Sequence, residues 1–141
     1  LGASASASPV WMLHGPHAPL SARNDWQRAG ATLVACRNDG LGRLDIPGAL
    51  QELGARGITR LFCEGGGGLA ASLMRAGLVD EMLVFSAGHV FGADGTAGLG
   101  GMNVSTIGPH PFHLLGAGPC GDDLMHHWRR RDLVTELLTN W

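Results

Sequence analysis

The sequence predicts an α/β fold, with a mostly parallel sheet flanked by helices and an antiparallel strand pair near the C-terminus. Two observations predict it. Short apolar runs alternate with amphipathic helical stretches through the middle of the chain, the usual pattern of parallel strands joined by helices. Later, two apolar runs follow one another without a helical stretch between them, which indicates antiparallel pairing. The 141 residues, 45% of them hydrophobic and 16% charged, fit one globular domain.

The first half of the chain contains the predicted parallel strands. These strands are the apolar runs at residues 10–14, 31–36 and 58–63. Residues 21–29 predict a short helix before Gly30. A second helix begins after the N-cap residue Asp45, carries apolar residues at helical spacing and ends at Gly57.

The second half begins with a helix and ends with consecutive strands. Apolar residues from Leu69 to Met74 recur at helical spacing, and Gly77 ends that helix. The remaining predicted elements are a strand at 81–87, a glycine-rich irregular stretch at 88–108, strands at 112–116 and 123–128, and an amphipathic helix at 132–141.

We expect one domain over residues 1–141, with residues 1–9 as a flexible lead-in. The helix at 132–141 is expected to pack on the body of the domain, with binding to a partner as the alternative. Cys36 and Cys63 each end an apolar run, so we expect both thiols to be buried.

The composition excludes several classes of function. The net charge of −2 gives no reason to expect a nucleic-acid partner. No apolar run approaches the ~20 residues of a membrane-spanning helix, so we expect no membrane partner. The chain has neither Lys nor Tyr, which excludes those residues as general bases or covalent catalysts. The histidines form no metal-ligand motif, and the adjacent His126 and His127 would face opposite ways in a strand, so we expect no metal.

One segment, Leu61–Met74, carries chemical information. An apolar run leads directly into four glycines, and a helix starts on them. A helix N-terminus offers unpaired backbone N–H groups and a partial positive charge, and glycine lets a bulky anion approach them closely. The segment therefore predicts a site for a phosphate or pyrophosphate. The alternative is a tight turn that needs glycine only for its backbone geometry.

Gly65, Gly67 and Ala70 also match the pattern G-x-G-x-x-A. A Rossmann dinucleotide site needs an acidic residue at the end of the following strand, and that strand ends in Phe85-Ser86-Ala87-Gly88. We therefore reject the Rossmann interpretation. Glu64 stands at the start of the glycine turn, where it either accepts hydrogen bonds from a polar substrate or caps local backbone N–H groups.

The chain resembles a known family through two adjoining motifs. Glu64-Gly65-Gly66-Gly67-Gly68-Leu69 is followed by Ala76-Gly77-Leu78-Val79-Asp80-Glu81, then by an apolar strand and a glycine-rich loop. This order resembles the C-terminal reductase domain of RibD proteins, which is related to dihydrofolate reductase. Val90–Gly95 is similar to the family's loop and Gly121–Leu124 to its closing strand, so the likeness runs from about Val10 to Arg129.

The resemblance implies a dihydrofolate-reductase-like fold and an NADPH-dependent reduction. In this family the ribosyl group of a phosphorylated aminopyrimidinone, a small-molecule substrate, becomes a ribityl chain. The expected cofactor-binding residues lie on the glycine turn, the first helical turns and the end of the first strand. They are Gly65, Gly66, Gly67, Gly68, Leu69, Ala70, Ser72 and His14. Glu64 matches the family's substrate-binding acid, and the family implies a cytoplasmic homodimer.

Two departures from the family keep an alternative open. His14 stands where the family has a hydroxyl residue that contacts NADPH. The N-terminal part of the family's domain, with its substrate-binding segment, has no counterpart here, so we expect the chain to be a piece of a longer protein. The alternative function is a non-catalytic relative that binds a dinucleotide or phosphate. A hydrolase would need a G-x-S-x-G nucleophile turn, and the sequence has none.

Overall fold

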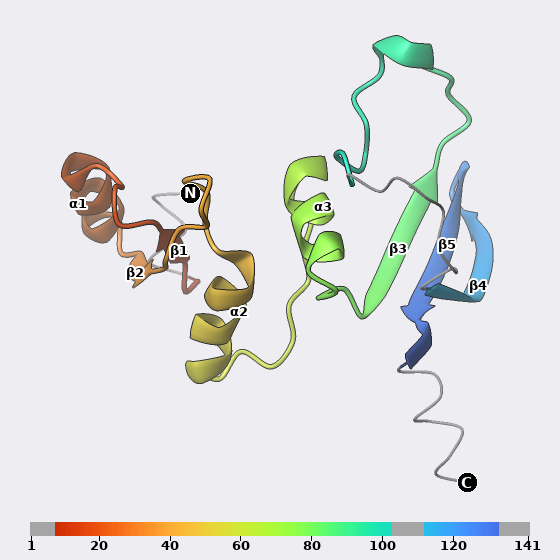
Figure 1. Cartoon of the computed structure of the whole chain (residues 1–141). Coiled ribbons are helices and arrows are strands. Elements are labelled where there is room, and N and C mark those ends of the chain that lie inside the picture. The colour runs from red at the N-terminus through yellow and green to blue at the C-terminus, as the bar shows by residue number, and fades with distance from the viewer. Residues whose placement is uncertain (1–7, 103–111, 133–141) are drawn as a thin grey trace, which may run out of the picture. The chain divides into compact units, whose positions relative to one another are not determined.

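A computed structural model describes residues 8–102 and 112–132 of the chain. It divides into two compact units, Leu1–Cys63 and Glu64–Trp141 (Figure 1), and each is described by itself. The expectation of one domain over the whole chain stays a prediction. The expected lead-in at 1–9 and the expected helix at 132–141 lie mostly outside the described residues.

The first unit contains a parallel strand pair joined by a helix. Strand β1 (Trp11–His14) pairs in parallel with β2 (Thr32–Ala35), so that Trp11 lies opposite Thr32 and His14 opposite Ala35. Helix α1 (Leu20–Arg28) connects these strands, and α2 (Ile46–Ala55) follows them with Asp45 in the N-cap position. These two strands and two helices confirm the sequence-based prediction to within one or two residues at most of their ends.

A small apolar core holds the first unit together. Its buried residues are Val34, Cys36 and Ala49, and they come from β2, the residue after it, and α2. Trp11 and Leu13 of β1 pack against them, as does Leu44. Cys36 is buried, which confirms one of the two cysteines expected to be inside. This burial raises the pKa of its thiol.

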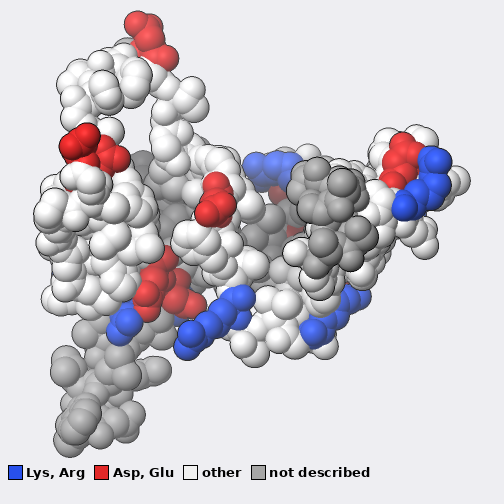
Figure 2. All heavy atoms as spheres, turned by 180° about the vertical axis from the view of Figure 1, so that it is seen from behind, with Lys and Arg blue, Asp and Glu red and all other residues white. Residues whose placement is uncertain are grey.

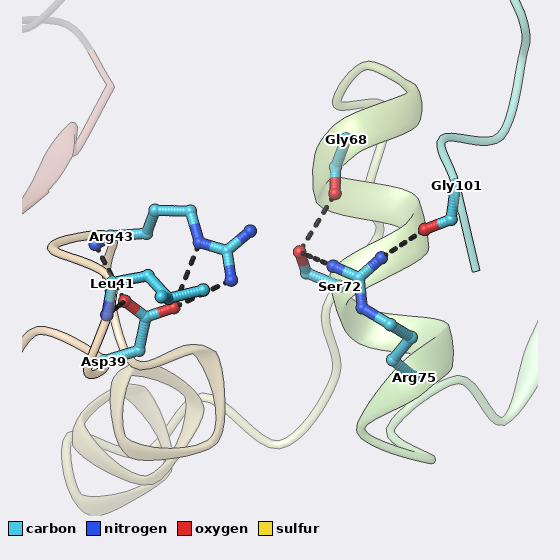
Figure 3. Close-up of polar contacts among 7 residues, drawn as sticks. All are labelled: Asp39, Leu41, Arg43, Gly68, Ser72, Arg75 and Gly101. Carbon is cyan, nitrogen blue, oxygen red and sulfur yellow. Dashed lines mark hydrogen bonds and ion pairs between the residues drawn. The ribbon is translucent and has the colours of Figure 1, made fainter. Parts of the chain in front are cut away.

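A tight turn between β2 and α2 is organised by one carboxylate. Asp39 Oδ1 accepts hydrogen bonds from the backbone N–H groups of Leu41 and Arg43, both at 2.9 Å, and Oδ2 accepts one from Arg43 Nε at 3.0 Å (Figure 3). These backbone and guanidinium hydrogen bonds lower the pKa of Asp39. Gly42 has a φ of +77°, a conformation that glycine adopts without strain.

The predicted strand at 58–63 is wrong in this structure. The segment is irregular, and Phe62 is 74% exposed. Cys63 is likewise exposed, which corrects the expectation that its thiol is buried. Apolar composition favours a strand, but a strand also needs a neighbouring strand to pair with its backbone, and the described residues offer this segment none. The sequence of residues 58–63 does not by itself determine whether a pairing strand is present.

The second unit contains helix α3 and a three-stranded sheet. Helix α3 (Gly67–Arg75) is followed by β3 (Glu81–Ser86), a 3₁₀ turn (Gly92–Asp94), β4 (Phe112–Cys120) and β5 (Asp123–Arg130). The strand order is β3-β5-β4, and both pairings are antiparallel. The expected β4–β5 pair is confirmed. The sequence analysis missed that β3 joins this pair at β5 instead of extending the parallel sheet.

Ionic contacts tie the edge strand β3 to β5. Glu81 Oε1 accepts hydrogen bonds from Arg129 at 3.0 Å and 2.8 Å, and Glu81 Oε2 lies 2.7 Å from His127 Nε2. The hydrogen bond with His127 and then those from Arg129 lower the pKa of Glu81. At the end of β5, Arg130 donates to the carbonyl of Gly77, in the turn that follows α3.

On the face seen in Figure 2, charged side chains lie in small groups with uncharged surface between them, and in some groups acidic and basic side chains are adjacent. None of the helices in the described ranges has the length and apolar character needed to cross a membrane.

Candidate functional site

The glycine turn forms an open helix N-terminus. Gly66 is the N-cap of α3, with φ −57° and ψ 170°, and no side chain caps the helix. The Gly66 carbonyl accepts hydrogen bonds from the N–H groups of Leu69 and Ala70, at 3.0 Å and 3.2 Å. At the first two helical positions, Gly67 and Gly68, a helix has no preceding carbonyl of its own to accept from the backbone N–H groups, which carry the positive end of its dipole.

The glycines of this turn differ in the space around them. Among the residues that the structure describes, a Cβ atom built on Gly66 or on Gly68 would meet nothing within 4 Å. One built on Gly67 would lie 2.8 Å from the carbonyl oxygen of Ala97 and 3.0 Å from that of Gly98. Gly67 is therefore required by packing inside the protein, whereas Gly66 and Gly68 leave room for an approaching molecule.

The segment that packs on Gly67 is residues 97–101, here called the strap. The N–H of Gly100 donates to the Gly67 carbonyl at 2.9 Å. Further along α3, Arg75 Nη1 donates to the Gly101 carbonyl at 2.6 Å, and Arg75 Nη2 donates to Ser72 Oγ at 2.9 Å (Figure 3). The strap thus contacts both the first and the last turn of the helix.

Ser72 and its neighbours lie on the first turns of α3, as the sequence predicts. The Ser72 hydroxyl donates to the Gly68 carbonyl at 3.0 Å and accepts the bond from Arg75. This hydroxyl thus both donates and accepts a hydrogen bond within the protein. Leu69 is exposed and Ala70 half-buried. A role for these side chains in binding a cofactor stays a prediction.

Glu64 and Gly65 precede the helix in an irregular, exposed stretch. The sequence left two roles open for Glu64, a substrate contact or a local cap. Since α3 has no side-chain cap in the structure, Glu64 does not cap this helix. An exposed carboxylate beside the glycine turn can accept hydrogen bonds from amide or amino groups of a bound molecule.

His14 belongs to the first unit, whereas the glycine turn belongs to the second. It is the last residue of β1, and its Nδ1 lies 3.0 Å from the Gly15 carbonyl oxygen. The structure brings together Glu64 through Ser72, all of which belong to the second unit. The predicted role of His14 is therefore untested.

The glycine turn has the chemistry that binds a pyrophosphate group. A pyrophosphate requires backbone N–H donors that no side chain occupies, and the uncapped first turn of α3 supplies them. It also requires free approach, which the empty space at Gly66 and Gly68 provides. The described residues contain no group of three or more side chains that could hold a metal ion.

Two solved structures share the α/β fold of this chain. A pyrimidine reductase-like protein from Corynebacterium diphtheriae superposes with a TM-score of 0.66 at 13% identity, covering 85% of this chain and 49% of that one. The RibD of Acinetobacter baumannii superposes with a TM-score of 0.64 at 16% identity, covering 85% of this chain and 37% of that one. The expected α/β fold class is therefore confirmed. Among the described strands, one pairing is parallel and two are antiparallel, which corrects the expectation of a mostly parallel sheet.

The sequence gives the family. The sequence model of the RibD C-terminal domain family matches residues 5–124, so the chain belongs to this family. The riboflavin biosynthesis protein RibD of Escherichia coli (strain K12) is 34% identical over 70 residues. That match covers 50% of this chain and 18% of the E. coli protein, so the chain corresponds to only a part of that relative.

The sequence did not predict the contact between Arg75 and the strap. Arg75 lies in the last turn of α3, where a cation is favourable on any helix because of the dipole. Nothing in that position indicates a contact with Gly101, which lies 26 residues further along the chain. The glycine-rich composition of the stretch does allow close backbone packing, but it does not identify the neighbour.

Proposed function

We propose that this chain is the reductase-type domain of a riboflavin-pathway protein and that it binds NADPH at the glycine turn. The observation that carries the proposal is the uncapped N-terminus of α3 beside two glycines with open space, in a chain of the RibD C-terminal domain family. The first helical turn supplies N–H donors for a pyrophosphate, and the helix dipole favours its negative charge.

The proposed substrate is a phosphorylated aminopyrimidinone, whose ribosyl group is reduced to a ribityl chain. When bound, NADPH supplies the hydride, so the protein's task is to orient two molecules and to stabilise charge. Glu64 is the proposed substrate contact, because its exposed carboxylate stands at the start of the glycine turn and accepts hydrogen bonds from amide or amino groups.

The test combines a binding measurement with a turnover measurement. The chain is titrated with NADPH and with NADH by calorimetry, and loss of NADPH absorbance is then followed with the aminopyrimidinone. The proposal expects preferential binding of NADPH and substrate-dependent oxidation of it. Binding without oxidation would favour the alternative, a non-catalytic dinucleotide-binding relative. Absence of binding would contradict the proposed function.

The family resemblance also supports a homodimer in the cytoplasm, and we propose both for this chain. Analytical ultracentrifugation over a range of protein concentrations tests whether the chain forms a homodimer. A single species with the mass of one chain at all concentrations would contradict it.

A further inference from the structure

The strap lies along α3 and is fastened to it at two places. At the first turn, the Gly100 N–H donates to the Gly67 carbonyl, and the Ala97 and Gly98 carbonyl oxygens approach Gly67 so closely that no Cβ fits. At the last turn, Arg75 donates to the Gly101 carbonyl. The two places are eight residues apart on the helix, which corresponds to ~12 Å along its axis.

The contact at the last turn of α3 is made by the side chain of Arg75. Its guanidinium donates to Gly101 with one nitrogen and to the Ser72 hydroxyl with another, so two hydrogen bonds fix its planar group (Figure 3). Hydrogen bonds from a charged group to a carbonyl are stronger than neutral ones. The Ser72 hydroxyl is itself fixed by its bond to Gly68, in the first turn of the helix. A chain of contacts therefore links the glycine turn, Ser72, Arg75 and the strap.

We propose that Arg75 is a positioning residue for the dinucleotide, because it holds the strap as one wall of the site at the glycine turn. This inference rests on the proposed function. The strap covers Gly67 and leaves Gly66 and Gly68 open, so it borders the space where a pyrophosphate would meet the helix N-terminus. A wall that is already in place reduces the ordering that binding must accomplish.

The experiment compares Arg75→Ala with Arg75→Lys and a matched control. The control is Arg56→Ala, since Arg56 also lies at the end of a helix, donates to the Glu52 carbonyl at 2.7 Å and pairs with the Glu52 carboxylate, but belongs to the first unit. Two quantities are measured for each protein: the hydrogen-exchange rate of the Gly100 amide and the affinity for NADPH. Thermal unfolding shows that each variant is folded.

Arg75→Ala is expected to speed exchange of the Gly100 amide about tenfold, because loss of a charge-assisted hydrogen bond frees the strap. Its affinity for NADPH is expected to fall several-fold. Arg75→Lys is expected to restore part of both effects, since an ammonium group keeps a bond to Gly101. Arg56→Ala is expected to change neither. Added NADPH is expected to slow Gly100 exchange in the parent more than in Arg75→Ala.

Three results would overturn the inference. Unchanged Gly100 exchange in folded Arg75→Ala would show that Arg75 does not hold the strap. Faster exchange with unchanged NADPH affinity would show that the strap is not part of the cofactor site. If the parent chain does not bind NADPH, the proposed function fails and the positioning role fails with it, while the exchange rates still decide whether Arg75 fastens the strap.

Discussion

Gly66 and Gly67 are adjacent in the sequence, yet the structure assigns them opposite responses to the same substitution. At Gly66 a Cβ meets nothing within 4 Å among the described residues, and the φ of −57° suits alanine. Gly66→Ala is therefore expected to leave stability nearly unchanged, because alanine restricts the unfolded chain by about 0.4–1 kcal/mol but is a poorer N-cap by a similar amount. The added methyl group occupies space offered to the pyrophosphate, so NADPH affinity is expected to fall about tenfold, or ~1.4 kcal/mol.

At Gly67 the added Cβ lies 2.8 Å from the Ala97 carbonyl oxygen, closer than a carbon and an oxygen ordinarily pack. Because the obstructing atoms belong to backbone, the strap or the helix must shift, and Gly67→Ala is expected to destabilise the second unit by about 1–3 kcal/mol. The control is Gly54→Ala, which places a methyl group in open space on α2 of the first unit.

The assay is urea unfolding combined with an NADPH titration of all three variants. We expect Gly66→Ala to lose affinity for NADPH with little change in stability, Gly67→Ala to lose stability, and Gly54→Ala to lose neither. NADPH affinity within twofold of the parent in Gly66→Ala would refute the assignment of the open space to the cofactor. Parental stability in Gly67→Ala would refute the packing of the strap.

Further predictions concern the substrate contact, the core and the response to acid. Glu64→Gln is expected to lower kcat/KM for the aminopyrimidinone about tenfold or more with NADPH affinity unchanged, because hydrogen bonds to a charged acceptor are the stronger ones; equal kinetics in the variant would contradict the role. Val34 is fully buried, so Val34→Ala is expected to cost about 2 kcal/mol in urea unfolding of the first unit, and a cost near zero would show a loosely packed core. The folded-state pKa of Glu81 is lowered, so its contribution to stability is present above the unfolded-state pKa and is lost as pH falls through the folded-state pKa. Acid unfolding of Glu81→Gln is therefore expected to depend less on pH in that range, and an unchanged slope would count against the contacts of Glu81 with His127 and Arg129.

Local sequence patterns were sufficient for the helices and for several strands. The N-cap Asp45 and the helical spacing after it predict α2, and four glycines before an apolar helical pattern predict the start of α3. These features depend on residues that are close in the chain. For the same reason the sequence identified the glycine turn as the candidate site.

Long-range pairing was beyond the sequence. The run 58–63 has the composition of a buried strand, but pairing partners decide whether a strand forms, and the structure gives it none among the described residues. Strand β3 was predicted as an element, whereas its antiparallel pairing with β5 depends on contacts such as that of Glu81 with Arg129, 48 residues away. The different surroundings of Gly66 and Gly67 also depend on a distant segment, the strap.

An NMR titration tests directly whether the glycine turn binds the pyrophosphate of NADPH. Backbone amide chemical shifts of the chain are recorded as NADPH is added, with inorganic phosphate and NADH in parallel titrations. We expect saturable shifts centred on the N–H groups of Gly66, Gly67 and Gly68, at lower concentrations of NADPH than of either comparison ligand. Saturable NADPH binding that leaves these three amides unmoved, or no binding at all, would contradict binding at the glycine turn.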